Sequence, residues 1–122
     1  MAKILVVDDS ETVRNRLSRE LMQNGHEVLE AADGVKGLEV LDANQNTEVV
    51  ISDVNMPEMD GITMCRKIKE KTYAENMHLF ILTTEFDQQL KAKGKEAGVK
   101  LWITKPVNMT KLNAVINKVV AG

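Results

Sequence analysis

The sequence predicts an α/β domain in which a five-stranded parallel sheet is doubly wound, with five helices on its two faces. Short apolar runs alternate along the chain with segments whose apolar residues recur at helical spacing. The runs show little polar alternation, as expected for parallel strands buried on both faces. They occupy residues 4–7, 28–31, 49–51, 79–82 and 101–103. Short links between the units favour right-handed crossovers within one sheet.

The segments between the strands carry helix signals of unequal strength. Ser10 is a candidate N-cap for the first helix, and Gly25 stands where a helix end favours a left-handed residue. The segment after Asn108 has the clearest apolar stripe, whereas segment 88–97 has the weakest. Gly94, within that weak segment, costs about 1 kcal/mol relative to alanine. We therefore expect the fourth helix to be the least firmly packed.

Length and composition narrow the class of protein. The 122 residues are sufficient for one domain, which we expect to span 1–122. A net charge of −2 without a long basic run argues against binding to nucleic acid. Cys65 is the only cysteine, so no internal disulfide forms. The apolar run at 4–7 is too short for a signal peptide or a membrane span. We expect a cytoplasmic monomer without membrane insertion.

Five polar residues stand at the predicted ends of strands. Asp8 and Asp9 follow the first strand, Asp53 the third, Thr83 the fourth and Lys105 the fifth. Each alone has a simple explanation, since an aspartate after a strand often caps the next helix. The joint pattern is more informative, because ligands of parallel α/β sheets bind at the carboxyl ends of the strands. We expect these side chains to meet at one edge.

Such a cluster is suited to phosphoryl transfer. Carboxylates about 4 Å apart repel by about 4 kcal/mol per pair at an effective dielectric near 20. A hard divalent cation offsets this repulsion, and oxygen ligands favour Mg²⁺. The lack of histidine and cysteine at these five positions argues against zinc. A carboxylate can attack phosphorus to give an acyl phosphate, while Lys105 and the Thr83 hydroxyl contact the phosphoryl oxygens.

The chain resembles the receiver domains of bacterial two-component response regulators, most closely the single-domain chemotaxis regulators of the CheY type. The resemblance covers the whole chain and implies a flavodoxin-like sheet with strand order 2-1-3-4-5. It rests on four motifs in order and spacing: Val7-Asp8-Asp9-Ser10, the segment from Asp53 to Gly61 (DVNMPEMDG), Leu82-Thr83 and Lys105-Pro106.

The resemblance implies a role for each residue of the acidic cluster. Asp53 is expected to be the phosphoacceptor. Asp9 and Asp53 would bind Mg²⁺ directly, the carbonyl oxygen of Asn55 would be a third protein ligand, and Asp8 would act through water. No other cofactor is implied.

The resemblance also implies a switch. Thr83 and Lys105 would hold the phosphoryl group, and the Lys105-Pro106 bond would be cis. Trp102 stands where the family usually has tyrosine or phenylalanine, the aromatic residue that moves inward on activation. Thr84 replaces the usual alanine or glycine beside the phosphoryl site, which is expected to narrow access for the phosphoryl donor and for attacking water.

The function implied is a signalling switch rather than an enzyme, although the chain would catalyse its own phosphorylation and dephosphorylation at Asp53. A histidine kinase would donate the phosphoryl group. The phosphorylated form would then bind a downstream protein, with the flagellar motor switch in chemotaxis as the leading candidate. A phosphorelay intermediate and a receiver with a non-motor target remain as alternatives.

Two functions from other classes compete with this interpretation. Aspartyl-phosphate hydrolases usually have two aspartates separated by one residue, whereas Asp8 and Asp9 are adjacent. A flavodoxin-like electron carrier needs a first loop that cradles the phosphate of FMN, and the loop here is acidic. Two further residues, His26 and His78, lie next to strand starts and are predicted to be surface or edge residues rather than metal ligands.

Overall fold

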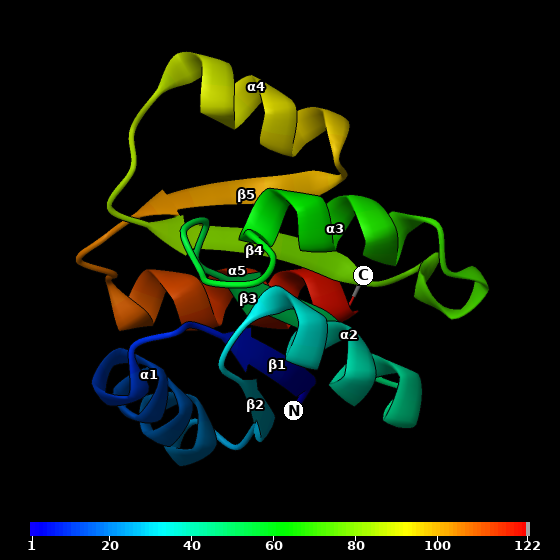
Figure 1. Ribbon diagram of the computed structural model, residues 1–122. Helices are drawn as coiled ribbons and strands as arrows, with labels where there is room; N and C mark the ends of the chain where they lie inside the picture. The colour runs from blue at the N-terminus through cyan, green and yellow to red at the C-terminus, as the bar shows by residue number, and fades with distance from the viewer. Residues whose placement is uncertain (122) are drawn as a thin grey trace.

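The computed structural model describes residues 1–121 and contains a five-stranded parallel sheet in the order β2-β1-β3-β4-β5 (Figure 1). The strands are β1 (Lys3–Val7), β2 (Glu27–Ala31), β3 (Val49–Ser52), β4 (His78–Thr83) and β5 (Val99–Thr104). The helices are α1 (Glu11–Gln23), α2 (Gly34–Ala43), α3 (Gly61–Lys69), α4 (Gln88–Glu96) and α5 (Met109–Ala121), with a short 3₁₀ helix η1 (Thr72–Ala74). The predicted fold class and strand order are confirmed.

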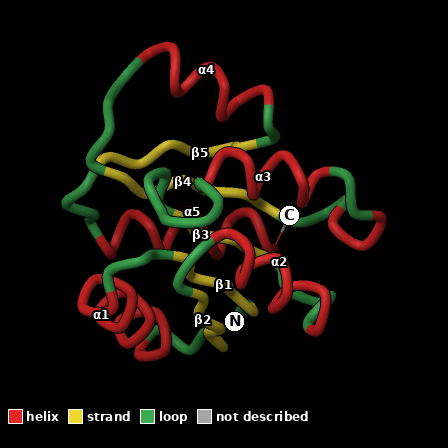
Figure 2. The backbone as a smooth tube through the Cα atoms, in the orientation of Figure 1, coloured by secondary structure: helices red, strands yellow, loops and turns green. Residues whose placement is uncertain are grey.

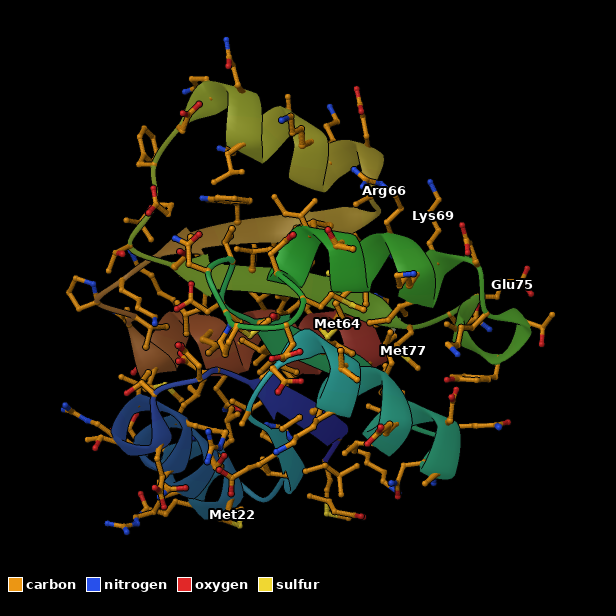
Figure 3. All side chains as sticks on the ribbon, viewed as in Figure 1. Met22, Met64, Arg66, Lys69, Glu75 and Met77 are labelled. Atoms are coloured by element: carbon orange, nitrogen blue, oxygen red, sulfur yellow. The ribbon has the colours of Figure 1, made fainter. Side chains whose placement is uncertain are left out.

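Two hydrophobic clusters cover the two faces of the sheet. Successive residues of β1 point to opposite faces, so that Ile4 joins the cluster beneath α1 and α5 while Leu5 joins the cluster beneath α2, α3 and α4. Figure 2 shows α3 in front of the sheet and α5 behind it. In Figure 3, Met64 lies inside, near α2 and α3, whereas Met22 lies on the outer side of α1; their exposed fractions are 0% and 52%.

The edge strands differ from the prediction that all five runs are buried on both faces. Every residue of β3 is buried, but Val28 and Leu29 of β2 and Leu101 and Ile103 of β5 are only partly buried. The reason is topological: β2 pairs only with β1, and β5 pairs only with β4. A strand at the edge of a sheet has a neighbour on one side only, so its side chains receive less cover.

Polar side chains define several element ends. Ser10 caps α1 by accepting a hydrogen bond from the Val13 amide, as predicted, and Gly25 after the helix has φ +89°. The prediction for His26 was wrong, because this residue is buried. Its Nδ1 accepts a hydrogen bond from the Ala2 amide at 3.0 Å, and its Nε2 lies 2.7 Å from Oδ1 of Asn113. His26 therefore connects Ala2, the residue before β1, to α5.

Candidate functional site

The five predicted residues lie together at the carboxyl end of the sheet. Asp8 and Asp9 follow β1, Asp53 follows β3, Thr83 is the last residue of β4, and Lys105 follows β5. Strand β1 lies between β2 and β3, and the chain crosses over β1 on its way from β2 to β3, so the site lies where the strand order reverses. This is the position at which doubly wound sheets bind ligands.

Lys105 is held between two carboxylates. Its Nζ lies 3.1 Å from Oδ2 of Asp8 and 3.1 Å from Oδ2 of Asp53. Burial alone would lower the pKa of Lys105, but hydrogen bonds to Asp53 and Asp8 and the charges of these groups outweigh it, so that the pKa lies above its usual value. The ammonium therefore stays protonated at neutral pH and offers a fixed positive charge beside Asp53.

Three carboxylates could hold a metal ion. One ligand atom from each of Asp8, Asp9 and Asp53 can be chosen so that all three lie within 4.8 Å of one another. Asp8 is buried, Asp53 is partly buried and Asp9 is exposed. An all-oxygen set that is open to solvent on one side fits a hard cation such as Mg²⁺, which keeps several of its waters. The residues present therefore fit the metal that the sequence predicts.

Hydrogen bonds orient two of these carboxylates. Oδ1 of Asp8 accepts from the Ser10 amide at 2.9 Å, and Oδ1 of Asp53 accepts from the Val54 amide at 2.7 Å. Oδ2 of each carboxylate faces Lys105. The loop after Asp53 returns against it at Gly61, where a Cβ would lie only 2.0 Å from the main-chain oxygen of Asp53. Only glycine leaves room for this close approach.

Glu85 connects three predicted site residues. Its amide donates to Oγ1 of Thr83 at 3.2 Å, its Oε1 accepts from Nδ2 of Asn55 at 2.9 Å, and its main-chain oxygen accepts from Nε1 of Trp102 at 3.2 Å. Thr83 is buried, whereas Asn55 is exposed and Trp102 is partly buried.

Arg14 is a neighbour of the site that the sequence did not reveal. Its Nη1 donates to the main-chain oxygen of Asp8 at 2.7 Å. An arginine in the first turns of a surface helix gives no pattern that distinguishes this contact from exposure to solvent.

Three further predictions concern features outside the acidic cluster. The Lys105-Pro106 bond is cis, as the resemblance implies. Trp102 packs with the cluster beneath α2, α3 and α4, and Ile103 packs with the opposite cluster.

Among residues 1–121, no helix has both the length and the apolar character that crossing a membrane requires.

Comparison with known proteins identifies the family of the chain. Residues 4–117 match the response regulator receiver domain family. The chain is 41% identical over 105 residues to chemotaxis protein CheY1 of Helicobacter pylori, covering 85% of each chain. It is 35% identical over 122 residues to protein PilH of Pseudomonas aeruginosa, covering 100% of both. The structure of Vibrio cholerae chemotaxis protein CheY4 matches with a TM-score of 0.90 and 36% identity, covering 98% of each chain. The chain therefore belongs to the response regulator receiver domain family of two-component signalling systems.

Proposed function

We propose that the chain is a phosphorylation-dependent switch in which Asp53 accepts a phosphoryl group from a histidine kinase. The observation that carries this proposal is the position of Lys105, whose ammonium contacts Asp8 and Asp53 at the same 3.1 Å distance. A cation at this point neutralises charge on a phosphoryl group that arrives at Asp53. Receiver domains act together with kinases and downstream proteins, which agrees with this reaction.

The reaction is a displacement at phosphorus. A carboxylate oxygen of Asp53 forms the new bond to phosphorus, while the bond from phosphorus to the imidazole nitrogen of the kinase breaks and leaves its electron pair on that nitrogen. Lys105 and the Thr83 hydroxyl hold the phosphoryl oxygens. Bound Mg²⁺, held by Asp9, Asp53 and the Asn55 carbonyl with Asp8 acting through water, would supply charge neutralisation.

Output runs through contact with another protein. Two of the relatives described above are named as chemotaxis proteins, and we propose control of the flagellar motor switch by a cytoplasmic, monomeric protein that binds no nucleic acid. PilH matches over the full length under a different name, which keeps a non-motor target and a phosphorelay role as alternatives. Capture of partners with beryllofluoride-loaded protein separates these roles, because a motor protein, a phosphotransfer protein or another target would be retained.

The phosphoacceptor is tested by labelling. Incubation of the protein with acetyl phosphate and Mg²⁺ should add one alkali-labile phosphoryl group per chain. Asp53→Ala and a metal chelator should each abolish the label. Asp42→Ala is the matched control, because Asp42 lies at the end of α2 and pairs with Lys71. Undiminished labelling of Asp53→Ala would refute the proposal.

A turnover assay separates the switch from the hydrolase alternative. A switch releases at most one phosphate per phosphorylated chain and lacks continued turnover of a generic phosphate ester such as p-nitrophenyl phosphate. Sustained release of p-nitrophenol that depends on Asp8 or Asp53 would favour the hydrolase instead. A visible absorption band from bound flavin would favour the electron carrier.

A further inference from the structure

Arg14 lies in α1 and reaches back to the loop that carries the acidic pair. Its Nη1 donates to the main-chain oxygen of Asp8 at 2.7 Å, and its Nε donates to Oε1 of Glu30 on β2 at 3.2 Å. The Arg14 side chain is only 16% exposed. We propose that Arg14, held by Glu30, is a positioning residue that orients the peptide between Asp8 and Asp9 and thereby sets the affinity of the acidic cluster for Mg²⁺, an inference that rests on the proposed function.

The contact acts on Asp9 through the backbone. The peptide bond is planar, so the hydrogen bond from Arg14 to the Asp8 carbonyl oxygen also orients the amide nitrogen and Cα of Asp9. The other groups of Asp8 are held independently, because its amide donates to the Ala31 carbonyl oxygen and its carboxylate accepts from the Ser10 amide. Asp9 itself is exposed. The fold therefore orients Asp9 mainly through its backbone, which sets the direction in which the side chain leaves the chain.

Glu30 has two effects on Arg14. It holds the guanidinium group at a second point, so that this planar group is fixed to β2 as well as to the loop after β1. It also offsets the positive charge, which would otherwise repel Mg²⁺ from the neighbouring cluster. The pair is neutral overall. Its influence on metal affinity therefore comes mainly from geometry.

Geometry and charge predict opposite results when Arg14 is removed. Loss of a cation near the cluster should tighten Mg²⁺ binding if charge dominates. Loss of orientation should weaken it, and residues that orient metal ligands typically change affinity by about 10- to 100-fold. The double variant Arg14→Ala/Glu30→Ala separates the two effects, because its net charge equals that of the wild type.

The experiment is a calorimetric titration of the full chain with MgCl₂. We expect Arg14→Ala/Glu30→Ala to bind Mg²⁺ about tenfold more weakly than the wild type, at the lower end of that range. Arg16→Ala/Glu20→Ala is the matched control on the same helix, because it also keeps the net charge: the Arg16 side chain is 83% exposed and pairs with Glu20 at 3.8 Å. The affinity of this control should be unchanged. Wild-type affinity in the double variant would overturn the inference.

Circular dichroism in the absence of Mg²⁺ checks that the double variant folds. If it does not fold, Arg14→Lys is used with Arg16→Lys as its control. Lysine keeps the charge but lacks the planar fork that reaches both the Asp8 carbonyl oxygen and Glu30. A several-fold weaker affinity of Arg14→Lys alone supports the inference, and equal affinities of the two variants overturn it.

Two further titrations separate failure of this inference from failure of the proposed function. If the wild type does not bind Mg²⁺, or if Asp9→Ala binds it equally well, the metal site itself is wrong and the inference fails with it. If the wild type binds, Asp9→Ala does not, and the Arg14 variants match the wild type, only the role of Arg14 is overturned.

Discussion

The indole ring of Trp102 lies directly against Gly94 of α4. A Cβ at residue 94 would stand 3.0 Å from Cζ3 and 3.3 Å from Cε3 of the ring. The predicted weakness of α4 thus has a structural counterpart, because the missing side chain leaves space for the indole. Helix α4 packs on β5 partly through Trp102 rather than only through its own short apolar stripe.

The effect of a Gly94 substitution on the free energy of unfolding should therefore depend on the side chain at residue 102. In a Trp102→Ala background, Gly94→Ala should raise the free energy of unfolding by about 1 kcal/mol, the difference in helix propensity. With Trp102 present, the new methyl group pushes the indole and α4 apart, and we expect most of this gain to be lost. Urea unfolding of the four proteins measures the coupling. An equal gain in both backgrounds would show that the ring and the helix are not in contact.

The capping residue of α3 should make stability depend on pH. Oδ1 of Asp60 accepts from the Thr63 amide at 2.9 Å, and Oδ2 accepts from the Thr63 hydroxyl at 2.7 Å. Burial alone would raise the pKa of Asp60, but these hydrogen bonds lower it below its ordinary value of 3.8. A lowered folded-state pKa gives stability that is present above pH 3.8 and lost as the pH falls through the folded value.

Asp60→Ala should therefore cost about 1 kcal/mol of unfolding free energy at pH 7, as for other N-caps. The difference from the wild type should narrow as the pH falls below 4, because the protonated carboxyl accepts hydrogen bonds less well. Chemical unfolding between pH 2 and pH 7 measures both values. A difference that stays constant over this range would mean that the cap acts without its charge.

The sequence predicted the site residues correctly where the topology of the sheet alone determines their position. Parallel strands end at one edge of the sheet, so residues after each apolar run had to meet there, and Asp8, Asp53 and Lys105 do. Edge position was harder to predict. Strands β2 and β5 have apolar residues like those of β3, and only the pairing order explains their greater exposure.

Contacts between distant side chains could not be predicted from the sequence. His26 is buried and its ring hydrogen-bonds Asn113 of α5, although the two residues are 87 positions apart. Arg14 reaches Glu30 across a helix and a turn, and no local pattern distinguishes it from the exposed Arg16. Such contacts depend on how helices are placed on the sheet, which periodicity leaves open.

The lifetime of the phosphoryl group on Asp53 tests whether the size of the Thr84 side chain restricts the access of water. This residue is exposed and follows Thr83 directly at the rim of the site. Hydrolysis requires a water molecule in line with the bond from Asp53 to phosphorus, and a smaller side chain should ease its approach. Thr84→Ala should lose its phosphoryl group several-fold faster than the wild type, whereas the exposed control Thr110→Ala should not change. Slower or unchanged decay of Thr84→Ala would show that Thr84 does not restrict the water.

The last prediction concerns the connection from Thr83 to Trp102. Both residues bind the main chain of Glu85, Thr83 through the amide and Trp102 through the carbonyl oxygen. If a phosphoryl group on Asp53 draws the Thr83 hydroxyl toward it, the Glu85 amide loses its partner, and the segment that holds the indole is released. A shift from 1:99 to 99:1 would require about 5.5 kcal/mol of differential binding.

Fluorescence reports this step without labelling, because Trp102 is the only tryptophan. Phosphorylation of Asp53, or loading with beryllofluoride, should change its emission and lower its accessibility to acrylamide. The Thr83→Ala variant should still accept a phosphoryl group, but both fluorescence changes should be smaller. The reason is that the variant lacks the hydroxyl that accepts the hydrogen bond from the Glu85 amide. If emission and quenching are the same with and without phosphoryl on Asp53, Trp102 is a passive residue and the switch must run through another element.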